Sequence, residues 1–250
     1  MEELSILDQI ALLSNSGYKG LILKSESKED FDNFEEYMRV TESTDIFKIY
    51  AVFELYKSKY DIERYERWKL VVERIEAKGI QLWMIFGTDD FDDAFIEDKI
   101  REIVAYASPK KVEVILYPHS GTYLESSEEA LVFADKIDHP NLKLAFHLYH
   151  DIRAGHGSRI PEVFENIKHR LGAVTLAGTD SIADFTTKFT RDTTTIKPLG
   201  RGNYDMNDFV EILSNSGYQG SVGFMNFKLK HPTVYLPKSK EIWDSYFNGK

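Results

Sequence analysis

Four of the seven histidines lie at or near the ends of two apolar segments in the middle of the chain. The first segment, 112–117, is followed by His119, and the second, 142–148, contains His147 and is followed by His150 and His156. An imidazole exchanges its proton near neutral pH, so neighbouring imidazoles can supply a general acid and a general base. Imidazole nitrogens are also zinc ligands. The pattern indicates proton transfer or metal binding, although histidines at a strand end can equally cap the strand.

The two segments belong to a regular alternation of short apolar stretches and amphipathic helical patterns. The predicted strands are 21–23, 49–55, 80–86, 112–117, 142–148, 174–177 and 221–224. The predicted helices are 4–13, 31–38, one from Asp61, 94–107, 126–137, 161–171 and 206–213. Such alternation is typical of parallel strands joined by right-handed crossovers. Because the C-terminal ends of such strands meet at one rim, we expect the histidines to share that rim.

The fold class predicted from this order is α/β, a TIM (β/α)8-type barrel. Seven strands are recognisable and the first strand is missing or cryptic, and residues 1–250 form a single domain. A doubly wound open sheet is the alternative, but such a sheet usually carries a Gly-rich phosphate turn early in the chain. Residues 13–20 recur almost unchanged as residues 213–220, each time at a helix-to-strand connection. This repeat indicates two equivalent structural units and carries no information on function.

Alternation along each strand sorts the side chains that point into the barrel. The inward-facing candidates are Glu54, Trp83, Tyr117 and His147. Three of them, all except Trp83, are expected near the C-terminal rim. Glu113 and Lys143 fall at a lower level of neighbouring strands, so an ion pair between them is expected inside the barrel.

Loops after the later strands add polar candidates for substrate binding. These are Asp180, Lys197, Arg201 and Asn226. Arg201 lies between two glycines ahead of a helix start at Asp205, where backbone N–H groups could seat a phosphate or sugar hydroxyls. The same segment could simply be a tight turn entering the helix. A carboxylate on the rim, such as that of Asp180, is often only solvated.

Composition excludes several classes of function. A net charge of -10 argues against nucleic acid as a partner, because phosphate binding needs clustered Lys and Arg. The chain has no cysteine, which excludes disulfides, thiolate catalysis and zinc ribbons. Its apolar stretches are too short to cross a membrane. A soluble protein is expected, with no distinction between cytoplasm and periplasm and no indication of the oligomeric state.

Taken together, the motifs resemble the sugar phosphate isomerase/epimerase family, the xylose isomerase-like TIM barrels that also include endonuclease IV. The resemblance covers nearly the whole chain. It is densest in residues 117–121, 147–150 with Gly155, 199–202 and 217–220. DNA repair by analogy with endonuclease IV is not expected, because the charge and the missing ligands argue against it.

The resemblance implies a divalent metal held by Glu, Asp, His and Glu at the ends of four strands. The matching positions here are Tyr117, His147, Ala177 and Met225. Only His147 keeps a metal-binding side chain, while His150 matches an accessory histidine and His119 a histidine of the pocket. The usual metal site is therefore expected to be lost or rebuilt. A zinc or manganese ion on His147 and His150, with His119 as a third ligand for zinc, is the cofactor that this leaves open.

The function expected from the residues and the resemblance is that of an isomerase or epimerase acting on a sugar or sugar derivative. His147 and His150 would act as acid and base or as residual metal ligands, and His119 would polarise a carbonyl or hydroxyl group. Glu54 and Asp180 would bind hydroxyls or move a proton. The same groups could serve a lyase or hydrolase on a modified sugar. The alternative is a carbohydrate-binding barrel that has lost its metal ligands and catalyses nothing.

Overall fold

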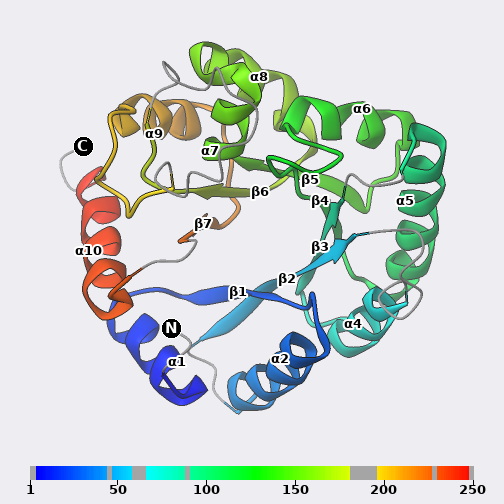
Figure 1. Cartoon of the computed structure of the whole chain (residues 1–250), viewed down its shortest axis with the longest axis horizontal. Coiled ribbons are helices and arrows are strands. Elements are labelled where there is room, and N and C mark those ends of the chain that lie inside the picture. Colours follow the sequence, from blue (N-terminus) through cyan, green and yellow to red (C-terminus); the bar gives the residue numbers. More distant parts are fainter. Residues whose placement is uncertain are drawn as a thin grey trace.

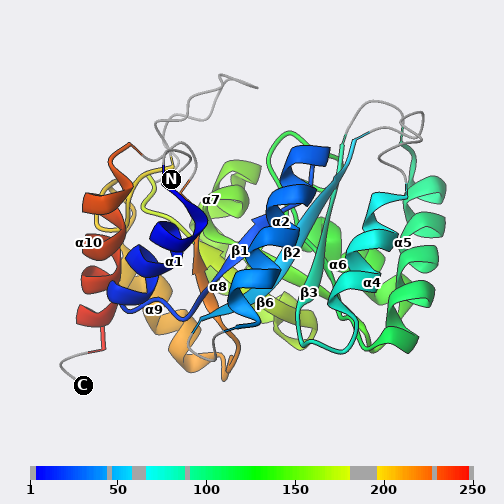
Figure 2. The same cartoon turned by 90° about the horizontal axis from the view of Figure 1, so that it is seen from below.

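The computed structural model describes residues 4–43, 47–57, 66–87, 91–180, 196–226 and 230–247, in which seven parallel strands form one sheet in sequence order. The sheet curves into a nearly closed barrel with the helices outside it (Figure 1, Figure 2). The strands are β1 Gly20–Lys24, β2 Lys48–Tyr56, β3 Gln81–Phe86, β4 Val114–Leu116, β5 Leu142–His147, β6 Leu171–Leu176 and β7 Val222–Phe224. The helices are α1 Ile6–Asn15, α2 Lys28–Thr41, α4 Arg67–Ile75, α5 Asp93–Ala107, α6 Ser127–Ile137, α7 Leu148–Asp151, α8 Ile160–Ile167, α9 Met206–Asn215 and α10 Pro232–Ser245.

The barrel prediction is confirmed, including the count of seven strands. Within the described ranges no eighth strand lies between β1 and β7, whose side chains nevertheless meet. The rings of Tyr18 and Phe224 are 5.6 Å apart, and Ile22 packs against the backbone of Gly223. The barrel is therefore closed by hydrogen bonds everywhere except at this seam, where side chains bridge the gap.

Local signals in the sequence account for the helix boundaries. The hydroxyl of Ser126 accepts a hydrogen bond from the N–H of Glu129, whose carboxylate accepts from the N–H of Ser126, which fixes the start of α6. The repeated connection ends α1 and α9 with Gly17 and Gly217, at φ angles of 86° and 76°. That left-handed conformation is cheap only for glycine, so both helices end where the repeat predicts.

Two apolar layers hold the barrel together. The larger layer lies between the outer faces of the strands and the helices, and β5 contributes Leu142, Leu144 and Phe146 to it. The smaller layer fills the barrel interior. Its buried members are Ala51, Trp83, Ile85, Ile115, Tyr117, Ala145 and Ala173. The inward orientation predicted for Trp83 and Tyr117 is confirmed.

The inward orientation predicted for Glu54 is wrong. Glu54 pairs in register with Met84, which belongs to the outer layer, whereas Phe53 and Leu55 pack inside the barrel. Both faces of a parallel strand are apolar, so a single polar residue does not reveal which face points inward. Glu54 is buried beneath the helices and lies outside the expected site.

The expected ion pair between Glu113 and Lys143 is also wrong. Lys143 pairs in register with Ile115, one level above Glu113, and the amide of Gln81 donates to the Glu113 carboxylate at 2.7 Å. Helix α10 was not among the predicted helices, and it contains Pro237 in its interior. The expected helix start at Asp61 and most of the Thr-rich loop, 181–195, lie outside the described residues.

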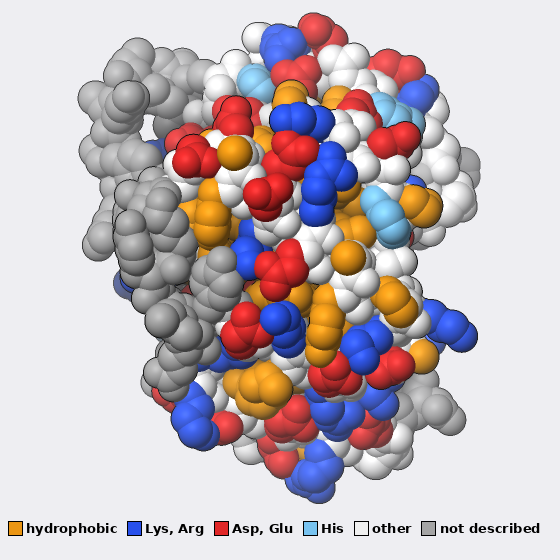
Figure 3. Space-filling view, turned by 90° about the vertical axis from the view of Figure 1, so that its right-hand side faces the viewer, with side chains coloured by type: hydrophobic (Ala, Val, Ile, Leu, Met, Phe, Trp, Pro, Cys, Tyr) orange, Lys and Arg blue, Asp and Glu red, His pale blue; other side chains and the backbone are white. Residues whose placement is uncertain are grey.

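The outer helices present charges of both signs. On the face that carries α5, Lys and Arg side chains alternate with Asp and Glu, without a continuous basic stripe (Figure 3). Glu97 on α5 pairs there with both Arg101 and Lys136. No helix in the described part of the chain is long and apolar enough to span a bilayer.

Candidate functional site

Three imidazoles meet where β4 and β5 end. The ring of His150 lies 4.1 Å from that of His119 and 4.3 Å from that of His147, measured between centroids. His147 is the last residue of β5, and His150 lies in α7, which follows directly. His147 and His150 are 0% and 1% exposed, whereas His119 is half-buried. The predicted convergence of the three histidines at one rim is therefore present in the structure.

Backbone groups fix all three rings. The Nδ1 atom of His147 accepts the N–H of Tyr149 at 3.1 Å, and Nδ1 of His150 accepts the N–H of Ser120 at 3.2 Å. The Nδ1 atom of His119 faces the carbonyl oxygen of Ser120 at 2.9 Å. The N–H of Ser120 thus donates to His150, whereas the carbonyl oxygen of Ser120 accepts from His119.

Burial keeps these imidazoles neutral. Desolvation and, to a lesser extent, proximity to His119 lower the pKa of His147 to about 3. The pKa of His150 lies well below its usual value, chiefly because of burial and secondarily because of His119 and His147. Burial also lowers the pKa of His119. A charged imidazole deprived of water is costly, so the cluster carries no proton in excess at neutral pH.

Two hydroxyl groups lie next to the imidazoles. The ring of Tyr117 is 6.2 Å from that of His147 and 6.1 Å from that of His150. Burial raises the pKa of Tyr117, an effect moderated by the nearby Thr175, which pairs with His147 across β5 and β6. Trp83 supports Tyr117 from 5.1 Å, with its own N–H donated to Gln81.

Three buried polar atoms of this cluster have no partner among the described residues. They are Nε2 of His147, Nε2 of His150 and the hydroxyl of Ser120. Leaving a buried donor or acceptor unpaired costs about 1–3 kcal/mol per group. Several such groups at one place are typical of a binding site rather than of a folded core.

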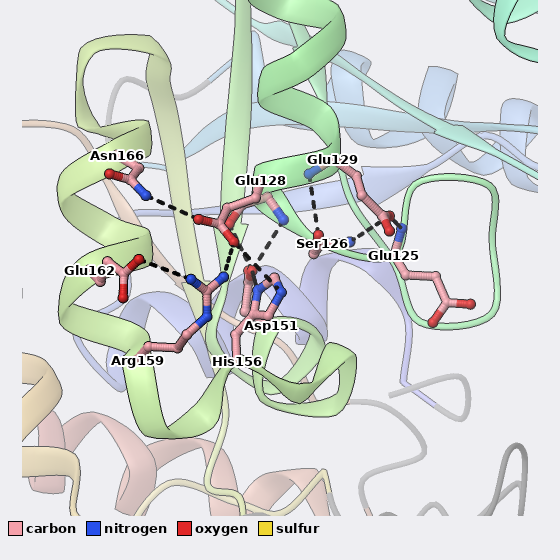
Figure 4. A network of polar contacts seen from close by, with 10 residues as sticks. Glu125, Ser126, Glu128, Glu129, Asp151, His156, Arg159, Glu162 and Asn166 are labelled. Atoms are coloured by element: carbon pink, nitrogen blue, oxygen red, sulfur yellow. Dashed lines mark hydrogen bonds and ion pairs between the residues drawn. The ribbon is translucent and has the colours of Figure 1, made fainter.

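A second polar network joins the end of α7 and the segment after it to α6 (Figure 4). The Oδ1 atom of Asp151 accepts hydrogen bonds from the N–H and hydroxyl of Ser127 at 3.1 and 2.8 Å, at the N-terminus of α6. His156 donates to the same oxygen at 3.3 Å, and its other nitrogen lies 3.7 Å from Glu128, which also pairs with Arg159. Its bond to Asp151 raises the pKa of His156. This network anchors α7, and with it His150, to α6.

The predicted loop residues fall into separate places. Asp180 forms an ion pair with Lys197 and accepts the N–H of Asn203, so two predicted residues meet at the end of β6. Arg201 lies over the ring of Tyr235 and lines a cavity of about 210 Å³ against α10. Asn226 is half-buried just beyond β7. No contact between these loop residues and the imidazoles is found in the described ranges.

The donor chemistry of the site does not fit the metal that the resemblance implies. Among the residues that the structure describes, no group of three or more His, Asp or Glu side chains is arranged to hold a metal ion. The backbone N–H groups facing Nδ1 of His147 and His150 place the ring proton on Nε2, which is buried and has no partner in the described structure. A protonated nitrogen has no lone pair for a metal. The expectation of a zinc or manganese ion on these residues therefore finds no support in the geometry.

Sequence reasoning missed two contributors to the site. Thr175 is not among the candidates named from the sequence, although its register opposite His147 makes it a neighbour of the cluster. Asp151 follows His150 directly in the sequence, but its burial against the N-terminus of α6 is visible only in the structure. The part that Ser120 plays rests on its backbone, which a sequence does not reveal.

Comparison with known proteins assigns the fold to a family. Residues 10–241 match the model of the xylose isomerase-like TIM barrel family. A search of curated proteins found no match.

Solved structures agree on the fold. An L-ribulose 3-epimerase shares 11% identity at a TM-score of 0.74, covering 97% of this chain and 89% of the other. A 3-keto-D-glucoside 4-epimerase from E. coli, YcjR, shares 15% identity at 0.72, covering 97% and 94%. The IolI protein with a binding zinc atom shares 14% identity at 0.73, covering 96% and 90%. Likeness at these identities shows the fold alone. The match over residues 10–241 establishes that the chain belongs to the xylose isomerase-like TIM barrel family.

Proposed function

We propose that this protein is an isomerase or epimerase that acts on a sugar or sugar derivative by proton transfer at the C-terminal rim of the barrel. The observation that carries the proposal is the buried group of three imidazoles at the ends of β4 and β5, with polar atoms that lack partners. His119, His147 and His150 are the proposed catalytic residues. Relatives of this fold that act on sugars, such as the L-ribulose 3-epimerase, support the substrate class.

The chemistry needs only groups that the site contains. A base removes the proton from the carbon next to a carbonyl group, and the C–H electron pair becomes the C=C bond of an enediolate. The carbonyl electron pair moves onto oxygen, where a hydrogen-bond donor stabilises it. Return of the proton to the former carbonyl carbon, with transfer of the hydroxyl proton from one enediolate oxygen to the other, gives an isomer. Return of the proton to the opposite face of the original carbon gives an epimer. No oxidant or reductant is consumed.

Substrate contacts are proposed for residues around the cluster. Tyr117 offers its hydroxyl next to the imidazoles, and Trp83 supports its ring from below. The pair of Asp180 and Lys197, together with Asn226, lies beyond the ends of β6 and β7 and would meet hydroxyls farther along the sugar. Arg201 would contact only a substrate long enough to reach its cavity. The acidic net charge favours an uncharged sugar over a highly phosphorylated one.

A non-catalytic sugar-binding barrel is the competing function, favoured by the apolar residues Ala177 and Met225 at two ligand positions of the family. Both functions predict sugar binding, so a test must observe proton transfer itself. A panel of ketoses and aldoses is first screened by thermal shift, because a specific ligand raises the unfolding temperature. Each stabilising sugar is then incubated with the protein in D₂O and followed by proton NMR.

Deuterium entering the carbon next to the carbonyl, faster than without protein, supports the enzyme. Sugar binding without deuterium exchange supports the binding barrel. The variant His147→Ala is the control for the site. Unchanged binding and exchange in that variant would show that the imidazole cluster is not where the sugar binds.

A further inference from the structure

The proton positions on the three imidazoles follow from their backbone partners. Since an N–H group only donates, Nδ1 of His147 and of His150 must accept, and each neutral ring carries its proton on Nε2. Since a carbonyl oxygen only accepts, Nδ1 of His119 carries the proton and its Nε2 keeps a lone pair. The cluster therefore presents two N–H donors and one basic nitrogen.

The same backbone contacts oppose metal binding. Coordination through Nε2 would move the ring proton to Nδ1, where it would point at the N–H of Tyr149 or of Ser120, about 3 Å away. Rotating either ring would break the hydrogen bond that orients it. The other family ligand positions hold Tyr117, Ala177 and Met225, of which two have no lone pair suited to a hard cation.

Two unpartnered donors close together suit an oxygen atom that gains negative charge. The Nε2 atoms of His147 and His150 are buried and have no partner in the described structure, although their rings are only 4.3 Å apart. A neutral imidazole can polarise a carbonyl group as an electrophile. Such donors stabilise charge strongly where water is excluded.

We propose that this barrel works without a metal, because the Nε2–H groups of His147 and His150 hold the carbonyl oxygen of a keto sugar at the place where the family resemblance implies a cation. This inference rests on the proposed function and assigns its roles. His119, whose Nε2 lone pair lies on the ring nearest to His150, is the base. The assignment reverses the roles expected from the sequence, where His119 was to polarise the carbonyl.

The first test reads the proton positions directly. Long-range ¹H–¹⁵N correlation spectra of the uniformly labelled full chain at pH 7.5 distinguish rings protonated on Nδ1 from rings protonated on Nε2. The variants His119→Gln, His147→Gln and His150→Gln assign each ring by its loss. We expect Nε2–H on His147 and His150 and Nδ1–H on His119. Nδ1–H on either His147 or His150 overturns the donor pair.

The second test is calorimetric titration of the EDTA-treated, dialysed protein with zinc chloride and with manganese chloride. We expect the same heats from the wild type and from His147→Gln, with no change in the ring spectra of the wild type. One-to-one binding that is lost in His147→Gln and shifts both rings overturns the inference. The variant His139→Gln, just before the N-terminal end of β5 and therefore at the opposite end of that strand from His147, is the matched control for histidines that bind metal weakly.

The third test separates this inference from the proposed function. D-Fructose is compared, in the presence of EDTA, with sorbitol, which has the same carbon chain without a carbonyl group. A shift of the two Nε2–H resonances by the ketose alone supports the donor pair. Turnover of any sugar only after zinc is added overturns the inference and leaves the proposed function intact. Absence of sugar binding and of deuterium exchange, with the expected ring protonation, overturns the proposed function instead.

Discussion

Two groups of histidines only a few residues apart in the sequence have opposite environments. His147 and His150 lie inside the rim with unpaired Nε2 atoms and lowered pKa values. His156 lies farther along the same segment, bonded to Asp151 and close to Glu128, with a raised pKa. The Nε2 atoms of His147 and His150 have no hydrogen-bond partner in the described structure, whereas both ring nitrogens of His156 face carboxylates of the fold.

The difference separates binding from structure. A carboxylate beside His156 favours the charged imidazole and closes a network that ties α7 to α6. No carboxylate contacts His147 or His150 in the described structure, so burial dominates there and the rings stay neutral. Histidine as a residue type thus predicts little. The hydrogen-bond partners of a histidine indicate whether it stabilises the fold or is available to bind a ligand.

Replacing His119 should have the largest effect of the changes that test the difference between the imidazole cluster and His156. The change His119→Gln removes the proposed base, so turnover of the sugar identified by screening should fall by about 10²–10⁴-fold. The matched change His156→Gln removes the imidazole of the second polar network, around Asp151. Turnover should fall by less than about tenfold, since His156 touches no reacting group. Initial rates of deuterium exchange measure both. Equal losses in the two variants contradict the division between the groups.

Acid should destabilise the protein through the inner group. The pKa of His147 is about 3 in the folded protein, below its ordinary value, so the unfolded chain alone takes up a proton as the pH falls below about 6.5. Stability is then lost at about 1.4 kcal/mol per pH unit for this imidazole. Urea unfolding at pH 7, 6 and 5 measures the slope. His147→Gln should reduce the slope by about one proton, and an unchanged slope contradicts the lowered pKa.

The barrel could be predicted from the sequence because the same strand and helix patterns recur along the whole chain. Seven apolar segments alternating with helical patterns leave few topologies, and Gly17 and Gly217 mark two of the connections. The convergence of His119, His147 and His150 followed from strand order alone, because the ends of parallel strands share a rim.

Finer features were not predictable from the same patterns. The orientation of Glu54 depends on which apolar face of β2 meets the helices, and both faces look alike in the sequence. The proton positions on the imidazoles depend on the peptide groups of Ser120 and Tyr149, whose directions come from loop conformation. Parallel strands thus encode where side chains gather, while loops determine their chemistry.

The second polar network, around Asp151, should contribute more to the stability of the fold than to turnover. Ser127→Ala removes the hydroxyl that donates to the buried Asp151 at 2.8 Å, and we expect a loss of about 1–2 kcal/mol in the free energy of unfolding. Ser245→Ala, whose exposed hydroxyl bonds only the carbonyl of Ile242, should cost less than about 0.5 kcal/mol. Urea unfolding at pH 7.5 compares them. Equal effects would mean that the bond to Asp151 stabilises no more than a surface contact.

His156 should give a pH dependence of opposite sign to that of His147, and this is the smallest effect expected. Because Asp151 raises the pKa of His156, its stabilising effect is complete below the ordinary imidazole pKa and is lost as the pH rises through the folded value. His156→Gln should therefore destabilise the protein more at pH 6 than at pH 8.5, by about 1 kcal/mol or less. A greater loss at pH 8.5 would show that the imidazole acts through packing rather than charge. His156 would then differ from His147 and His150 only in how deeply it is buried, and not in the charge of its imidazole.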